Sequence, residues 1–168
     1  MRTLFKITQG ELAAVRLDLK RPHDFALERV GFVACRFGRL QPVGLAILAA
    51  EYLPVADEDY INAPGYGALI GAAAFRKALQ RVYHNEVGLF HVHTHRGRGR
   101  PRFSPTDERE MPKFVPDFFH ARGSVVHGAL VLSDDSMLGY YWLPGRPAHG
   151  VIDEFRVVGT PMCRIGES

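Results

Sequence analysis

Residues 87–107 read VGLFHVHTHRGRGRPRFSPTD, and this stretch decides the fold and the candidate site together. Its apolar beginning predicts a strand over residues 87–94, and Ser104-Pro105 predicts the start of a helix. Alternate residues of a strand point to the same face, about 6–7 Å apart. His93 and His95, at the end of this strand, can therefore bind one small cation through neutral imidazoles.

A carboxylate from the next segment would complete this cation site. Asp107 stands in the first turn of the predicted helix and would become the third protein ligand. Three protein ligands and an open fourth position are typical of catalytic zinc, whereas structural zinc sites are usually closed by four. The cysteines, Cys35 and Cys163, are far apart in the sequence and form no cluster, which argues against a structural zinc site.

The same residues also have purely structural interpretations, which stay open. Ser at the N-cap, Pro at the first helical position and an acid at the third form a capping-box-like helix start. This is compatible with Asp107 as a ligand, because a cap fixes where the helix begins and thereby aims the carboxylate. His91 lies on the same strand face, further from the strand end. It is expected to be a buried polar residue or a support for the ligands rather than a ligand.

The rest of the chain alternates strands with a few helices. Apolar residues at three- and four-residue spacings predict an amphipathic helix over residues 68–83. Residues 125–132 and 137–142 alternate in hydropathy around Ser133-Asp134-Asp135-Ser136, which predicts a hairpin. The other expected elements are strands over 3–7, 11–18, 31–37, 42–55 and 150–158, a short helix over 22–28, and a helix from Pro105 to about Pro112, with Pro112 and Pro116 breaking a longer one. This order predicts an α/β chain of the α+β, three-layer type, with a mixed sheet flanked by helices.

Composition and charge exclude several classes of protein. The chain has 168 residues, of which 46% are hydrophobic and 23% charged, so it is expected to form one globular domain and not a disordered chain, a collagen or a coiled coil. The longest apolar run, residues 43–50, is far shorter than the roughly 20 residues of a membrane-spanning helix. The first residues lack the apolar core of a signal peptide. We therefore expect a cytoplasmic protein with no membrane partner.

At the histidine motif the sequence resembles a known family. His93-Thr94-His95, followed by Ser104-Pro105-Thr106-Asp107, resembles the metal motif of the JAMM/MPN metalloproteases, also called the JAB domain. The family pattern also has an upstream glutamate in an E-x-x-G context before an apolar strand, and Glu28-Arg29-Val30-Gly31 fits it. Glu51 is the rival for this acid but lacks that context. The resemblance covers most of residues 1–168 as a single domain, and it implies a curved mixed sheet with a JAB/MPN-like (cytidine-deaminase-like) core, as in the short stand-alone bacterial members.

The sequence departs from the family pattern between the two halves of the motif. Residues 96–103 separate His95 from Ser104, which is one residue more than the family usually has. Arg96 stands where a proline commonly follows the second histidine. The spacing of Ser104 and Asp107 is kept, so the departure concerns the path of the loop and any substrate contact that it makes.

The resemblance implies a zinc-dependent metallopeptidase with one Zn²⁺ per chain, held by His93, His95 and Asp107. Its substrate would be a peptide or isopeptide bond at the C-terminal tail of a ubiquitin-like protein or its conjugates. Zinc lowers the pKa of a bound water to about 7 and polarises the scissile carbonyl. Glu28 would take the proton of that water and pass it to the leaving amine, and Ser104 would donate a hydrogen bond to the developing oxyanion.

An arginine-rich segment, residues 96–102 (RGRGRPR), lies next to the predicted metal site. Arg98 and Arg100 are predicted to contact an acidic face or tail of a protein substrate, and a solvated loop is the plain alternative. Two other functions stay open. A catalytically silent scaffold of the same fold would only bind partners, although the intact motif residues argue against it. A nucleic-acid-associated protein would use the arginine segment, but one short cluster is weak support for that partner.

Overall fold

The computed structural model describes residues 1–159 and 163–165, and in this part of the chain it shows three α-helices and a nine-stranded sheet. The helices are α1 (Gln9–Leu19), α2 (Ala72–Tyr83) and α3 (Pro105–Ala121), with a short 3-10 helix η1 (Asp57–Asp59). The strands are β1 (Arg2–Thr8), β2 (Val30–Leu40), β3 (Gly44–Pro54), β4 (Gly88–Thr94), β5 (His127–Leu132), β6 (Met137–Trp142), β7 (Gly150–Val151), β8 (Glu154–Val158) and β9 (Cys163–Ile165).

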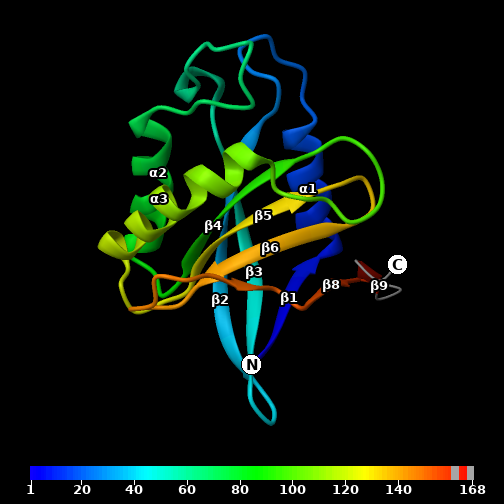
Figure 1. Ribbon diagram of the computed structural model, residues 1–168, viewed down its shortest axis with the longest axis vertical. Helices are drawn as coiled ribbons and strands as arrows, with labels where there is room; N and C mark the ends of the chain where they lie inside the picture. Colours follow the sequence, from blue (N-terminus) through cyan, green and yellow to red (C-terminus); the bar gives the residue numbers. More distant parts are fainter. Residues whose placement is uncertain (160–162, 166–168) are drawn as a thin grey trace.

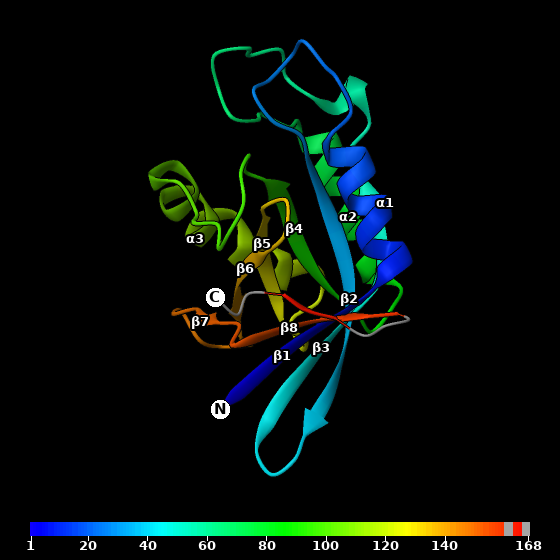
Figure 2. The ribbon, with the colours of Figure 1, turned by 90° about the vertical axis from the view of Figure 1, so that its right-hand side faces the viewer.

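The sheet is mixed, with strand order β7-β6-β5-β4-β2-β3-β1-β8-β9 (Figure 1). At its centre β2 pairs antiparallel with both β3 and β4, while β4 and β5 run parallel. β2 and β3 form a long hairpin whose tip projects beyond the helices (Figure 2). At the opposite end lie the segments that precede β2 and follow β3, together with the end of β4.

Apolar side chains cover both faces of the sheet and place the helices in two layers. On one face Leu12 and Val15 of α1 pack into a core with β-strand residues such as Ile47. On the other face Val82 of α2 and Val115 of α3 pack into a second core. The alternation of side chains along each strand supplies both cores, as expected for a sheet that is buried on both sides. The mixed α+β class predicted from the sequence is confirmed at this level.

The strand expected over residues 11–18 is wrong, because this segment is helix α1. Thr8 is its N-cap, and the Thr8 side chain accepts a hydrogen bond from Glu11 N at 3.1 Å. The buried residues of α1 are Leu12, Val15 and Leu19, which have the three- and four-residue spacing of a helix. The cap and this spacing favour the helix over the expected strand.

Two further expectations about helices are wrong. Residues 22–28 form no helix but a loop that leads directly into β2. In α3 the helix does not break at Pro112 or Pro116 but continues to Ala121. A proline inside a helix removes one backbone hydrogen bond and costs about 3 kcal/mol. Pro112 and Pro116 are four residues apart on the less buried side of α3, whereas Met111, Val115 and Phe118 are buried, and their packing offsets this cost.

The remaining differences concern the ends of elements. The helix expected over residues 68–83 begins at Ala72, and the strand expected over residues 150–158 is two strands, β7 and β8. Between them Asp153 accepts a hydrogen bond from Thr3 N at 2.7 Å, and this contact holds the turn that separates the two strands against β1. The hairpin of β5 and β6 is confirmed, and Cys35 is buried. No helix in the described part of the chain is both long and apolar enough to cross a bilayer.

Candidate metal centre and the adjoining cleft

The end of β4 lies beside the beginning of β2, and this juxtaposition builds the candidate site. Because the two strands are antiparallel, His93 is the register partner of Val30. Glu28, which comes just before β2, is thereby brought next to the last residues of β4. His95 extends β4 by donating its backbone N–H to Leu132 O at 2.8 Å. The motif histidines and the upstream acid meet through sheet register, although more than sixty residues separate them in the chain.

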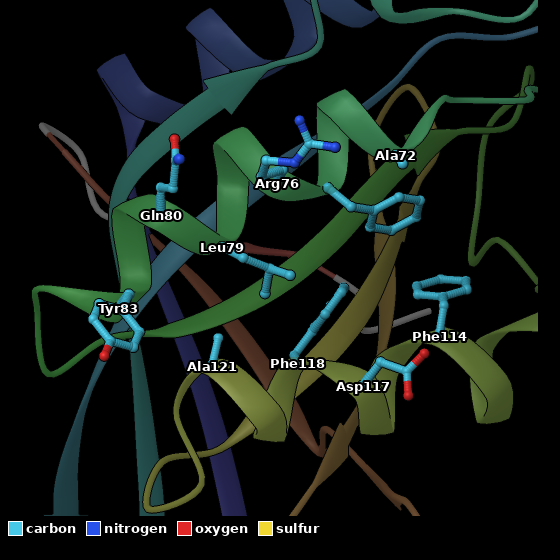
Figure 3. A pocket seen from close by; sticks show the side chains of 10 residues that line it. Ala72, Arg76, Leu79, Gln80, Tyr83, Phe114, Asp117, Phe118 and Ala121 are labelled. Atoms are coloured by element: carbon cyan, nitrogen blue, oxygen red, sulfur yellow. The ribbon is translucent and has the colours of Figure 1, made fainter.

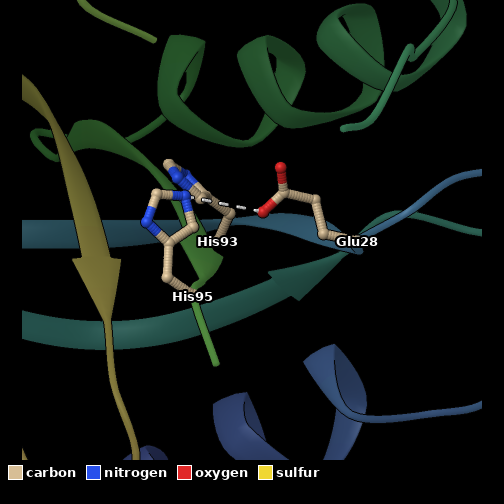
Figure 4. A group of neighbouring side chains, drawn as sticks. All are labelled: Glu28, His93 and His95. Atoms are coloured by element: carbon tan, nitrogen blue, oxygen red, sulfur yellow. Dashed lines mark ion pairs between the residues drawn. The ribbon is translucent and has the colours of Figure 1, made fainter. Parts of the chain in front are cut away.

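Four ligand-type side chains converge at this point. Glu28, His93 and His95 each offer one ligand atom, and these atoms all lie within 4.8 Å of one another (Figure 4). His95 Nε2 lies 3.9 Å from Glu28 Oε2. Asp107 Oδ2 lies 3.4 Å from His93 Nε2 and 3.7 Å from His95 Nε2. The structure therefore brings together Glu28 and all three predicted ligands.

The start of α3 aims Asp107 at the histidines. Ser104 is the N-cap, and Asp107 N donates to Ser104 Oγ at 3.1 Å. In return Ser104 N donates to Asp107 Oδ2 at 2.7 Å, which completes the capping box that the sequence predicted. The oxygen held by the cap is the same oxygen that faces both histidines. Because Ser104 Oγ is an acceptor in the cap, its own hydroxyl hydrogen remains free to donate toward the site.

The donor set fits a divalent metal ion such as zinc. His93 is only 2% exposed, and neither of its ring nitrogens has a hydrogen-bond partner among the described residues. Leaving a buried polar atom unpaired costs about 1–3 kcal/mol, so such an atom calls for an explanation. Ligands at zinc bond lengths of about 2.0–2.1 Å in a tetrahedron would be separated by about 3.3 Å. The distances from Asp107 Oδ2 to the two imidazole nitrogens are close to that spacing.

The pKa values of the two carboxyl groups in the site are shifted in opposite directions. Burial raises the pKa of the Glu28 carboxyl, and the neighbouring His93 and His95 offset only part of that effect. Burial would likewise raise the pKa of Asp107, but the imidazole of His93, whose Nε2 lies 3.4 Å away, and the hydrogen bonds with Ser104 outweigh it, so the pKa of Asp107 lies well below its usual range. Asp107 thus has the character of a permanent anion, and Glu28 that of a proton acceptor.

Glu28 is positioned by Gly67, which contacts it, and by its neighbour Arg29, which is anchored in the fold. Neither was predicted from the sequence. Glu28 N donates to Gly67 O at 2.8 Å, and a side chain at residue 67 would place its Cβ 2.5 Å from Glu28 Oε1. The next residue, Arg29, is fully buried, forms an ion pair with Asp57, and lies over the ring of Tyr60 at 5.3 Å. The Pro64-Gly65 and Gly67 cluster signalled a loop in the sequence, but nothing in it indicated contact with Glu28.

His91 and Glu51 lie outside the cluster of Glu28, His93 and His95. The His91 ring contacts Phe32 and Phe114 at centroid distances of 5.7 and 5.1 Å. Burial, with a smaller contribution from His93, lowers the pKa of His91 to about 3, so its ring is neutral. Glu51 lies on β3, where its Oε2 is 2.6 Å from Arg81 Nη2. Neither residue is positioned to replace Glu28.

The arginine segment is held against the turn between β5 and β6. Arg98 Nε donates to Asp135 Oδ2 at 3.0 Å, and Gly99 N donates to Asp135 Oδ1 at 2.7 Å. Gly97 and Gly99 adopt φ angles of +112° and +82°, which favour glycine. The segment therefore has a defined path, although the Arg98 side chain is 83% exposed. Its predicted contact residues, Arg98 and Arg100, are outside the cleft described next, whereas Arg96 lines it.

A cleft of about 730 Å³ opens beside the ligand cluster. Glu28 and His95 form part of its wall, α1 forms another part, and Arg96 a third. A second hollow, of about 530 Å³, lies between α2 and α3, and no member of the ligand cluster lines it. There Leu79 and Phe118 point toward one another across the gap between the helices (Figure 3). The first cleft is thus the one from which a substrate could reach the ligand cluster.

Comparisons with known proteins add little to this geometry. No protein-family model matches the sequence, and no curated protein matches it. Among solved structures, the Trichoplax adhaerens STIL N-terminal domain is similar, with a TM-score of 0.40 and 9% sequence identity over 82% of this chain and 41% of that chain. A likeness at this level carries no argument about function, so the site has to be interpreted from its own chemistry.

Proposed function

We propose that this protein is a zinc-dependent metallopeptidase of the JAMM/MPN type. One observation carries the proposal: Glu28, His93, His95 and Asp107, which come from three separate segments, converge with ligand-like spacing around a point that their own hydrogen bonds do not fill. His93, His95 and Asp107 would hold the ion, leaving Glu28 free to act. Neutral imidazoles and a carboxylate suit zinc better than magnesium, which prefers oxygen ligands.

The residues of the chain have separate tasks in amide hydrolysis. Zinc, when bound, supplies Lewis acidity that activates water and polarises a carbonyl. Glu28 accepts the proton of the attacking water and delivers it to the nitrogen of the leaving amine, a task that suits a carboxylate whose pKa is raised by burial. Ser104 donates its free hydroxyl hydrogen toward the developing oxyanion. Asp107 stays ionised throughout, held by the cap of α3.

The substrate proposed is a peptide or isopeptide bond at the C-terminal tail of a ubiquitin-like protein or its conjugates. This part of the proposal is supported by the likeness of the His93–Asp107 motif and its upstream glutamate to the JAMM pattern. The cleft beside Glu28 and His95 offers a path by which an extended tail reaches the ligand cluster.

The test is amide hydrolysis that depends on the proposed ligands. Zinc-loaded protein is incubated with mixed synthetic peptides and with isopeptide-linked ubiquitin-like conjugates, and the products are identified by mass spectrometry. The proposal predicts cleavage that is abolished by a chelator, restored by zinc, and absent in His93→Ala. Metal binding without cleavage of any substrate would favour the catalytically silent scaffold instead. Cleavage that persists in His93→Ala would overturn the proposed site.

A further inference from the structure

The cleft beside the ligand cluster carries more positive than negative charge. Arg16, Lys20, Arg21 and Arg96 line it, against the acidic side chains of Glu28 and Asp134. Its walls also include apolar residues, among them Leu19 and Leu27. A groove with apolar walls and a few fixed cations next to a hydrolytic centre is suited to a peptide segment that carries negative charge.

Two of the four cations are already neutralised by acids of the protein. Lys20 Nζ lies 2.8 Å from Asp134 Oδ1. Arg21 Nε lies 2.7 Å from Asp18 Oδ1, and its Nη2 lies 3.3 Å from Asp57 Oδ1. These pairs hold the walls of the cleft in place, and a ligand would have to break them to use either cation.

The other two cations, Arg16 and Arg96, have unused donors. Arg16 Nη2 makes one long contact of 3.4 Å with Ser133 O, and its Nε is buried without a hydrogen-bond partner. Arg96 is exposed and has no hydrogen bond or ion pair within the described residues. A guanidinium offers five N–H donors in a planar fork that matches a carboxylate. Among the described residues neither arginine, one on α1 and one on the β4–α3 loop, has an ion pair, so the two leave the cleft with unmatched positive charge.

We propose that Arg16 and Arg96 bind a carboxylate of the substrate, so that the preferred substrate carries an acidic group close to the scissile bond. The inference rests on the proposed peptidase function and names its substrate class. A peptide carboxylate is favoured over nucleic acid because phosphate backbones require many free cations along a surface. Here, within the described part of the chain, two of the cations that line the cleft lack an ion pair, and they lie in a concavity. The carboxylate comes either from an Asp or Glu side chain or from the substrate's own C-terminus.

The test uses short peptide libraries of neutral residues that carry either Glu or Gln at one fixed position. Each library is made with a free C-terminal carboxylate and as the amide, which separates the two sources of the charge. Cleavage by the zinc-loaded protein is followed by mass spectrometry. Binding of the same fluorescently labelled libraries is measured with zinc-loaded Glu28→Gln protein. We expect one of the two carboxylates to improve kcat/KM and binding by about tenfold, which is typical of a charge-assisted hydrogen bond.

The variants Arg16→Gln and Arg96→Gln should remove this preference. Arg16→Lys, which keeps the charge but not the fork, should retain only part of it. Arg39→Gln removes the same charge at the exposed far end of β2 and should leave the preference unchanged. Because Arg96 is exposed in a loop, its variant is expected to fold even if changes at Arg16 disturb α1, and thermal melting checks both.

The outcomes separate this inference from the function on which it rests. Cleavage without any preference for a carboxylate, or a preference that survives both Gln variants, would overturn the inference and leave the peptidase in place. Carboxylate-dependent binding that needs Arg96, with no cleavage of any library or of the isopeptide-linked conjugates, would support carboxylate binding by the two arginines and overturn the peptidase. Stronger binding of a single-stranded oligonucleotide than of the acidic peptides would assign the cleft to phosphate and overturn the inference.

Discussion

Two buried histidines on neighbouring strands, His93 at the end of β4 and His127 at the beginning of β5, differ in how their rings are bonded. His127 Nδ1 accepts a hydrogen bond from Leu89 N at 3.0 Å, and its Nε2 donates to Arg122 O at 2.9 Å. His93 is as deeply buried but has neither ring nitrogen paired among the described residues. His127 therefore joins backbone segments, whereas the ring of His93 is left unpaired beside His95 and Asp107, as the proposed metal site requires.

The comparison teaches how a site can be distinguished from a core in a structure without ligands. Burying a polar atom is unfavourable unless it is hydrogen-bonded. A ring that is satisfied by the backbone needs no further partner. A ring that is unpaired, and that faces a second imidazole and a carboxylate, is a candidate metal ligand. Changes around His93 should thus affect chemistry and metal binding, and changes at His127 should affect stability.

The largest expected effect is that of Glu28→Gln on catalysis. The substitution keeps the shape of the side chain but removes its ability to accept a proton. General base catalysis contributes about 10²–10⁴-fold, so kcat should fall by at least the lower figure. The zinc content and the melting temperature should stay near those of the wild type, because the three proposed ligands are untouched. Glu51→Gln is the matched control, since Glu51 pairs with Arg81 outside the site. Full activity of Glu28→Gln together with loss in Glu51→Gln would show that the acid was placed wrongly.

A smaller effect on catalysis is expected from Gly67→Ala. The added Cβ would lie 2.5 Å from Glu28 Oε1, so the carboxylate has to move while the backbone of both loops can stay. Small displacements of catalytic groups are costly, and kcat should fall by about tenfold or more with the zinc content unchanged. Gly65→Ala is the control, because a Cβ at residue 65 meets nothing within 4 Å. Equal effects of the two substitutions would show that Gly67 has no special role in positioning Glu28.

The smallest effects are changes in stability, and they compare the two histidines directly. In metal-free protein at pH 8, His127→Gln should lower the free energy of unfolding by about 1–3 kcal/mol, because it disturbs two buried hydrogen bonds. His93→Gln should cost clearly less, since it breaks none. Chemical denaturation measures both. A larger loss in His93→Gln than in His127→Gln would contradict the comparison.

The difference in stability between the wild type and His127→Gln should depend on pH, and the pKa of His127 fixes the sign. Burial lowers the pKa of His127 from its ordinary value of 6.5, so the ring stays neutral in the folded state while the unfolded chain takes up a proton. The unfolded state then binds more protons, and stability falls as the pH drops through 6.5. The wild type should therefore lose more stability than His127→Gln over this range. Parallel stability curves for the two proteins would exclude His127 as the cause.

The sequence predicted the parts of the site that are local in the chain. The alternating histidines of β4 and the cap at Ser104 depend on neighbouring residues, and both are present in the structure. Glu28 was found only through its motif, because its approach to His93 depends on the pairing of β2 with β4. The contact of Gly67 with Glu28 depends on two loops that meet in space and had no signal in the sequence.

The same limit applies to the arginine segment, and it explains the errors about the helices. The position of the arginine segment beside the site followed from the motif. The pairing of Arg98 with Asp135, however, depends on a turn more than thirty residues away. That pairing leaves Arg96, and not Arg98 or Arg100, at the cleft. Likewise α1 and the continuation of α3 through Pro112 and Pro116 depend on packing against the sheet, which local preference does not reveal.

The metal content of three purified proteins tests the central claim most directly. Wild-type protein, prepared without chelator and with zinc supplied, should hold about one zinc per chain, because His93, His95 and Asp107 would form a three-ligand site. The His93→Ala/His95→Ala double variant should hold almost none, whereas His127→Gln should hold as much as the wild type. Elemental analysis against protein concentration gives the ratios. Full zinc occupancy in the double variant, or no zinc in the wild type, would contradict the account.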